Sequence, residues 1–155
     1  MVQVEWGGNM AFEVSPPSGV QFTLDSQPEF GGQAKGPTPG EALLGALAAC
    51  TAMDVISILR KKQQTVTRYR LEVDGEKPPE GEYPRPLINI RVKHILSGQD
   101  LDPVAVARAI ELSDEKYCSV MATLRSAPEI TTTWEIVQEE RGEERGERRS
   151  PVPAP

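Results

Sequence analysis

The segment that decides the fold is Thr38–Lys62, TPGEALLGALAACTAMDVISILRKK, which predicts a single long helix. Thr38 is a favourable N-cap, Pro39 suits the first helical position, and Glu41 stands three residues after the cap, where it completes a capping box. The basic residues 60–62 lie at the other end, where the helix dipole favours cations. Local sequence therefore defines both ends of this helix.

The predicted helix is apolar on more than one face. At about 25 residues it is roughly 37 Å long, and a soluble helix that is apolar nearly all round must be buried nearly all round. Glu41, Asp54 and many small residues interrupt the apolar run, so close packing against protein is favoured over a membrane span. We expect a sheet on one side of the helix and a second subunit on the other.

Composition excludes several classes of protein. The chain has 155 residues and a formal net charge of −6, which supports one domain with a real core and argues against nucleic-acid binding through a basic face. Met1–Trp6 alternates like a strand and has neither the basic nor the apolar part of a signal peptide. We therefore expect a cytoplasmic protein that acts away from membranes.

The order of predicted elements indicates an α+β domain. Alternating patterns and turn residues predict strands and helices at the following positions: strands at Val2–Trp6, Met10–Val14 and Val20–Leu24, the long helix, strands at Thr67–Asp74 and Leu87–Leu96, a helix opened by Asp102-Pro103, a short helix ending at Arg125, and a strand at Glu129–Gln138. We expect one antiparallel sheet with the helices on one face. The domain is predicted to cover 1–138, followed by a charged, proline-rich, disordered tail at 139–155.

The two cysteines, Cys50 and Cys118, are the strongest candidates for reactive residues. In a cytosolic chain a permanent disulfide is not expected, which leaves two inert core thiols or a redox couple. A zinc site is not expected, since His94 is the only histidine and no CxxC spacing occurs. We expect His94 on the polar face of a strand, without a catalytic partner. Composition alone does not decide between the two interpretations of the cysteines.

Two motifs resemble the OsmC/Ohr superfamily. The first has the pattern Pro-x-Glu-x-Leu-Leu-x-Ala-Leu-x-x-Cys-Thr-Ala over residues 39–52, and the second is Glu-Lys-Tyr-Cys-Ser-Val over residues 115–120. The order of elements from residue 1 to about 138 is also similar to that family. The match is closest to its less-characterised OsmC-like subgroup.

The resemblance implies a fold and an activity. It implies an intertwined homodimer with the long helices at its centre, and a thiol peroxidase that prefers organic hydroperoxides and needs no separate cofactor. By motif position, Cys50 is the thiol that attacks the peroxide and Cys118 is the resolving thiol. An external dithiol then reduces the disulfide between them.

Two departures from the peroxidase branches bear on catalysis. Those branches supply an arginine from the N-terminal hairpin region, and residues 1–40 here contain none. The candidate substitutes are Lys35, Arg125, Arg70 and Arg91, and the sequence does not choose among them. Without one, Asp54 would raise the thiol pKa of Cys50 from one turn away.

The second departure concerns Glu41, which is one residue away from the position of the family glutamate. It is either only the capping-box carboxylate or a catalytic group. Nine residues along a helix amount to roughly 13 Å, so Glu41 could reach a Cys50 only across the dimer. Ser119 is expected to cap the short helix after Cys118, and a thiol near a helix start can have a lowered pKa.

Two further interpretations remain open at the sequence level. The chain could be a non-peroxidase dimer of the same fold that binds an apolar ligand at the subunit interface. It could also be a structural dimer whose cysteines are core residues only. The behaviour of the cysteine pair toward peroxide separates these alternatives.

Overall fold

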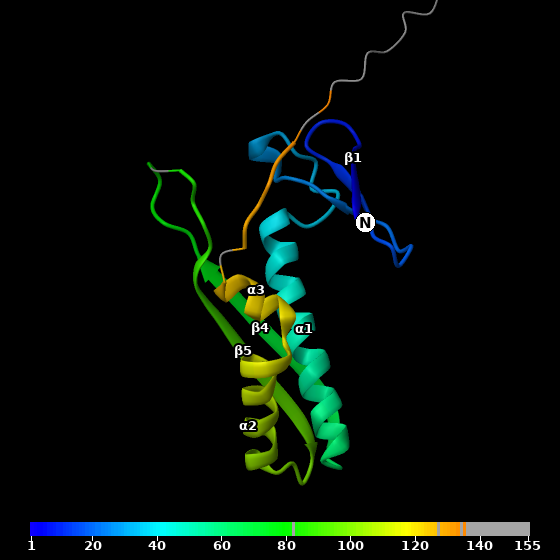
Figure 1. The fold of residues 1–155 in the computed structure, drawn as a ribbon, viewed down its shortest axis with the longest axis vertical. Coiled ribbons are helices and arrows are strands. Elements are labelled where there is room, and N and C mark those ends of the chain that lie inside the picture. The colour runs from blue at the N-terminus through cyan, green and yellow to red at the C-terminus, as the bar shows by residue number, and fades with distance from the viewer. Residues whose placement is uncertain (82, 127, 134, 136–155) are drawn as a thin grey trace, which may run out of the picture.

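The computed structural model describes residues 1–81, 83–126, 128–133 and 135 (Figure 1). The elements in chain order are β1 (Gln3–Trp6), β2 (Phe12–Ser15), β3 (Phe22–Leu24), the 3₁₀ turn η1 (Pro28–Phe30), α1 (Pro39–Lys61), β4 (Thr65–Glu76), β5 (Ile88–Gln99), α2 (Pro103–Leu112), the π-helical turn η2 (Ser113–Tyr117) and α3 (Ser119–Arg125). The α+β class and the long helix are as predicted from the sequence.

Helix α1 begins as the sequence predicts. The backbone N–H of Glu41 donates to Thr38 Oγ1 over 3.3 Å, and the Glu41 carboxylate accepts from the backbone N–H of Thr38 over 2.7 Å. This reciprocal pair is a complete capping box, and Pro39 occupies the first turn. The local sequence therefore sets the start of the helix that carries Cys50.

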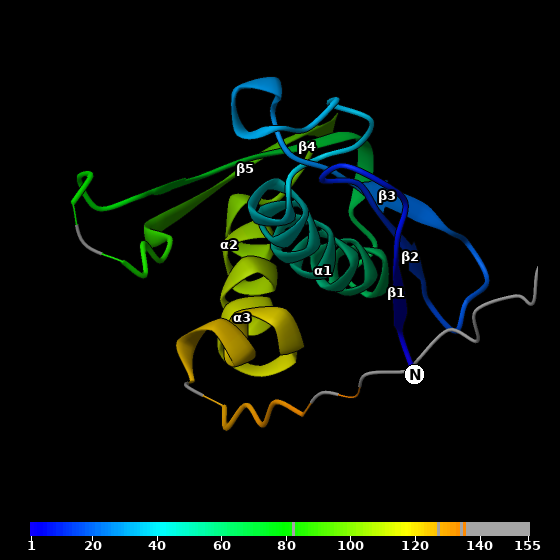
Figure 2. The same cartoon turned by 90° about the horizontal axis from the view of Figure 1, so that it is seen from above.

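The strands form two antiparallel sheets rather than the single sheet expected from the sequence. In the described residues, β1–β2–β3 make one sheet and β4–β5 make the other. The hairpin between β1 and β2 turns through Gly8 and Asn9, both with positive φ, as the Gly-Gly-Asn signature predicts. After β3 the chain runs into α1 before β4 begins, so the first sheet ends up apart from the β4–β5 ribbon (Figures 1 and 2).

The predicted strand at Glu129–Gln138 is not present in the part of it that the structure describes. Residues 129–133 and 135 carry no strand, and Ile130 is 84% exposed. A strand needs a neighbour to take its backbone hydrogen bonds, and in the described part of the chain no strand lies beside this segment. The rest of the stretch, and the predicted tail at 139–155, lie outside the described residues.

The core lies between α1, α2 and the β4–β5 ribbon (Figure 2). Its centre is a cluster of fully or nearly fully buried residues: Val55, Leu59, Ala105 and Ala109. On α1 the buried residues are spaced four apart, at 47, 51, 55 and 59, and so form one stripe. The structure of one chain therefore buries one face of α1 and leaves the others open.

The open faces of α1 are strongly apolar. An 18-residue window has a mean hydropathy of 2.0 with only 22% of it buried, so α1 is long and apolar enough to cross a membrane by length and composition alone. Met53, on an open face, is 70% exposed. Exposed apolar surface of this extent is typical of an interaction site.

A buried carboxylate organises the loop that leads into α1. Asp25 is 2% exposed, and its two oxygens accept hydrogen bonds from the backbone N–H groups of Lys35, Ser26 and Gln33. The backbone N–H of Lys35, followed by those of Ser26 and Gln33, holds the pKa of Asp25 below its usual value against the effect of burial. Sequence reasoning did not single out Asp25, since its partners are backbone groups up to ten residues away.

The lowered pKa of Asp25 predicts a loss of stability in acid. A carboxyl group with a depressed pKa in the folded state stabilises that state above about pH 4 and loses this contribution as the pH falls further. Asp25→Asn should therefore lower the free energy of unfolding at neutral pH and weaken its dependence on pH in the acid range. Urea denaturation at a series of pH values measures both effects. The exposed Asp100→Asn variant is the control, and equal acid slopes for all three proteins would contradict this prediction.

Candidate active site

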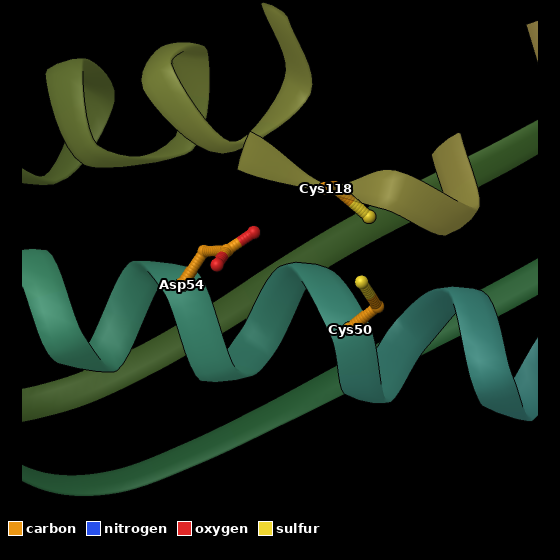
Figure 3. A group of neighbouring side chains, drawn as sticks. All are labelled: Cys50, Asp54 and Cys118. Atoms are coloured by element: carbon orange, nitrogen blue, oxygen red, sulfur yellow. The ribbon is translucent and has the colours of Figure 1, made fainter. Parts of the chain in front are cut away.

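The two cysteines meet where α1 passes the junction of η2 and α3. Cys50 comes from the middle of α1 and Cys118 from the single residue between η2 and α3, and their sulfurs face each other (Figure 3). Asp54, one turn along α1, extends toward the same gap, and the two sulfurs and a carboxylate oxygen all lie within 4.8 Å of one another. Both cysteines are free, Cys50 partly buried and Cys118 buried. The structure therefore brings the predicted pair together and adds a carboxylate.

The π-helical turn places Cys118. The backbone N–H of Cys118 donates to the Ser113 carbonyl over 2.9 Å, which closes the wide turn after α2. Cys118 itself is extended and its sulfur accepts from the backbone N–H of Met121 over 3.4 Å, so Cys118 is the N-cap of α3. The expectation that Ser119 is the cap is wrong, because the chain leaves helical geometry one residue earlier.

Two buried hydroxyl groups fix α1 against this turn. Thr51 Oγ1 and Ser113 Oγ are 2.8 Å apart, and both residues are completely buried. The Ser113 hydroxyl also lies 3.1 Å from Asp54 Oδ2, to which it can donate. Sequence reasoning missed this contact. The signal that could have indicated it is Thr51, a hydroxyl residue next to Cys50 in an otherwise apolar helix.

The pKa of the Cys50 thiol is lowered by backbone and side-chain donors rather than by a cation. The largest cause is the backbone N–H of Val120 in the first turn of α3, and the side chains of Cys118 and Ser119 add to it. Burial acts in the opposite direction, as does the charge of Asp54, which agrees with the sequence expectation for that residue. Hydrogen bonds to the charged form favour the thiolate of Cys50.

The pKa of Cys118 shifts in the other direction. Cys118 is 3% exposed, and this burial raises the pKa of its thiol, with only partial compensation from the backbone N–H of Met121. The expectation that a position near a helix start lowers the pKa of Cys118 is therefore wrong, since desolvation outweighs one N–H donor. Of the two thiols, Cys50 therefore ionises more readily than Cys118.

The three candidate arginines are engaged elsewhere. Arg70 pairs with Glu72, and Arg91 pairs with Asp74 and Glu76 on the β4–β5 ribbon. The remaining arginine candidate, at position 125, donates to the backbone carbonyl of residue 114. Among the hydrogen bonds of the described residues, none joins an arginine or lysine side chain to Cys50. The sulfur of Cys50 instead lies 3.9 Å from Ser119 Oγ.

Glu41 and His94 do not join the thiol site of their own chain. The Glu41 carboxylate is held in the capping box, where the Thr38 N–H lowers its pKa. His94 is half-buried rather than on a polar face, and its Nδ1 lies 2.5 Å from Tyr69 Oη. Burial lowers the pKa of His94. Within one chain, the site therefore consists of the two thiols, Asp54 and the hydroxyl and N–H groups around them.

Comparison with known proteins now decides the family. Residues 32–133 match the family described as "OsmC: OsmC-like protein". The chain belongs to this family. It is 38% identical over 135 residues to protein YhfA of Escherichia coli K12, an alignment that covers 87% of this chain and 96% of YhfA. The resemblance carried by the two cysteine motifs is thereby confirmed.

Solved structures agree with this assignment. A hypothetical protein from Aquifex aeolicus VF5 is 29% identical with a TM-score of 0.70, covering 90% of this chain and 97% of that one. An organic hydroperoxide resistance protein OsmC from Legionella pneumophila has a TM-score of 0.61 over 81% of this chain and 88% of that one. The latter is only 15% identical, so it shows that the fold is shared and no more.

The electrostatics of the site predict the effect of neutralising Asp54 in this OsmC-like protein. The charge of Asp54 opposes ionisation of Cys50, so Asp54→Asn should lower the pKa of Cys50 further and speed its alkylation several-fold at neutral pH. Rates are measured by mass spectrometry after timed iodoacetamide treatment of the Cys118→Ser background. Asp102→Asn, which keeps a good N-cap on α2, is the control. An unchanged or slower rate in Asp54→Asn would contradict the assigned electrostatics.

Proposed function

We propose that this protein is a thiol-dependent peroxidase that reduces organic hydroperoxides through the pair Cys50 and Cys118. The observation that carries the proposal is that two adjacent thiols differ in pKa and in burial. Cys50 has a lowered pKa and is partly open to solvent, while Cys118 is buried with a raised pKa. A peroxide-attacking thiol needs thiolate character and access, and its resolving partner must lie within reach.

The reaction assigns one step to each sulfur. The Cys50 thiolate attacks one peroxide oxygen, the O–O bond breaks, and the alkoxide takes a proton to leave as the alcohol. Cys50 is now a sulfenic acid. The Cys118 sulfur then attacks the Cys50 sulfur, the S–O bond breaks, and the hydroxide leaves as water with the proton from Cys118. One disulfide, one alcohol and one water are formed from two thiols and one hydroperoxide.

Regeneration uses an external dithiol. Its thiolate attacks the Cys50 sulfur, because Cys50 is the more accessible of the two and Cys118 is buried. The Cys118 thiolate leaves and takes up a proton, and the second thiol of the reductant completes its own disulfide. Two electrons pass from the dithiol to the protein and restore both thiols.

Apolar side chains next to the site support an organic substrate. A hollow of about 380 Å³ is lined by Asp54 and by the apolar side chains of Ile58, Leu112 and Tyr117, together with one serine and two lysines. An alkyl or aryl group of the hydroperoxide would lie in this hollow while its O–O bond faces Cys50. The hydroperoxide resistance proteins among the solved relatives agree in fold with this assignment.

A homodimer completes the proposal. The open apolar faces of α1 and the exposed apolar side chains of the first sheet, including Trp6 at 69% exposure, are surfaces that a second copy would cover. In such a dimer Glu41 would act on the Cys50 of the other subunit, since it does not reach its own. A carboxylate there would orient the hydroperoxide by accepting its O–H.

Peroxide treatment tests the activity. Reduced wild-type protein should lose two thiols per chain on exposure to cumene hydroperoxide, since both sulfurs enter the disulfide. Cys118→Ser should stop at a sulfenic acid that dimedone traps at Cys50, and Cys50→Ser should keep its single thiol. Free thiols are counted after denaturation, and the adduct is located by mass spectrometry. Survival of both wild-type thiols in excess peroxide would refute the peroxidase and favour the alternative, a dimer that binds an apolar ligand.

A charge on the open face of α1 tests the dimer. Met53→Glu puts a carboxylate where one chain leaves an exposed methionine, so the fold of the subunit should tolerate it, while a dimer interface should not. Sedimentation equilibrium should show a dimer for the wild type and a monomer for Met53→Glu. Val104→Glu, at an exposed apolar position of α2, is the control and should remain a dimer. A dimeric Met53→Glu protein would contradict the proposed interface.

A further inference from the structure

We propose that the reduced site also binds one thiophilic divalent cation of the zinc class, with Cys50, Cys118 and Asp54 as ligands. This inference rests on the geometry of the three side chains and not on the peroxidase activity. The sequence did not predict a metal site, because metal-binding spacing such as CxxC is absent. The ligands instead come from two distant segments that meet only in the fold (Figure 3).

The three ligand atoms are close to tetrahedral spacing. Zn–S bonds of about 2.3 Å and Zn–O bonds of about 2.0–2.2 Å put tetrahedral ligand atoms roughly 3.6–3.8 Å apart. The two sulfurs and the carboxylate oxygen lie within 4.8 Å of one another, so each pair needs to shorten by at most about 1.2 Å. Rotation of the three side chains about χ1 moves their ligand atoms by distances of this order.

Groups around the ligands already orient them. The Ser113 hydroxyl donates to Asp54 Oδ2 over 3.1 Å and is itself held by Thr51. Metal-binding carboxylates are typically fixed by such a second hydrogen bond. The Cys118 sulfur also accepts the backbone N–H of Met121 over 3.4 Å, and the Cys50 sulfur lies 3.9 Å from Ser119 Oγ.

The ligand set selects the class of metal. Two thiolates favour zinc, cadmium or copper(I), and the carboxylate favours a borderline divalent cation over copper(I). Binding releases the thiol protons, so affinity should rise with pH. Cys50 is only partly buried, which leaves a fourth position for water. Three protein ligands with an open position form an accessible zinc site rather than a closed structural one.

Metal binding and disulfide formation exclude each other, because both use the same sulfur lone pairs. If the proposed peroxidase reaction holds, a hydroperoxide takes two electrons from the two thiolates, the S–S bond forms, and the cation is released. Two protons convert the peroxide to alcohol and water. The cation would therefore shield the reduced pair from peroxide, and oxidation would eject the cation.

Cadmium titration of the reduced full-length protein tests the site. The sulfur-to-cadmium charge-transfer band should rise to saturation at one ion per chain, and Zn²⁺ should displace Cd²⁺. Cys50→Ser and Cys118→Ser should each lose saturation at this stoichiometry. Asp54→Asn should weaken binding by at least about 10-fold, and Ser113→Ala by about 10-fold, because the carboxylate loses its orientation. Asp102→Asn should bind like the wild type.

The outcomes are separable from those of the peroxide test. Absence of a saturable band, or equal affinity in Asp54→Asn and wild type, would overturn the three-ligand site. If Ser113→Ala does not fold, as circular dichroism would show, Asp54→Asn alone decides the role of the carboxylate. Thiols that react with peroxide in a protein that does not bind cadmium would refute only the metal site. Cadmium binding by a protein whose thiols survive peroxide would refute only the peroxidase.

Discussion

The buried contact between Thr51 and Ser113 is the constraint on which the site depends. Their hydroxyl oxygens are 2.8 Å apart and both residues are completely buried. Breaking the contact leaves the Thr51 hydroxyl without this partner in the core, while Ser113 keeps Asp54. Thr51 follows Cys50 directly, and Ser113 opens the turn that ends at Cys118. The contact therefore sets how α1 lies against that turn, and the two thiols face each other as a consequence.

The π-helical turn η2 positions Cys118 and the start of α3 beside Cys50. It ends α2 with a wide turn, leaves Cys118 extended, and starts α3, whose Met121 N–H donates to the Cys118 sulfur. The same short segment thus buries Cys118 and supplies the Val120 N–H that favours the Cys50 thiolate. The pKa of Cys50 is thus lowered by hydrogen-bond donors, although residues 1–40 contain no arginine.

Local signals in the sequence predict much of the fold. The capping box of Thr38 and Glu41, the Gly-Gly-Asn turn and the Asp102-Pro103 start all act within a few residues, and the structure contains each of them. The division into two sheets and the missing strand at Glu129–Gln138 depend on which segments meet, which a pattern along one chain does not contain. The thiol pairing came from the family motifs. The opposite pKa shifts came only from the structure, since they depend on burial and on single N–H groups.

The fold lowers the pKa of the partly open Cys50 and raises that of the buried Cys118. Each single variant, Cys118→Ser or Cys50→Ser, keeps one thiol. Its thiolate absorbance in the ultraviolet, followed as a function of pH, measures the ionisation midpoint of that thiol. The midpoint should lie below the ordinary thiol value of about 8.5 for Cys50 and above it for Cys118. A Cys50 midpoint at or above that of Cys118 would contradict this assignment.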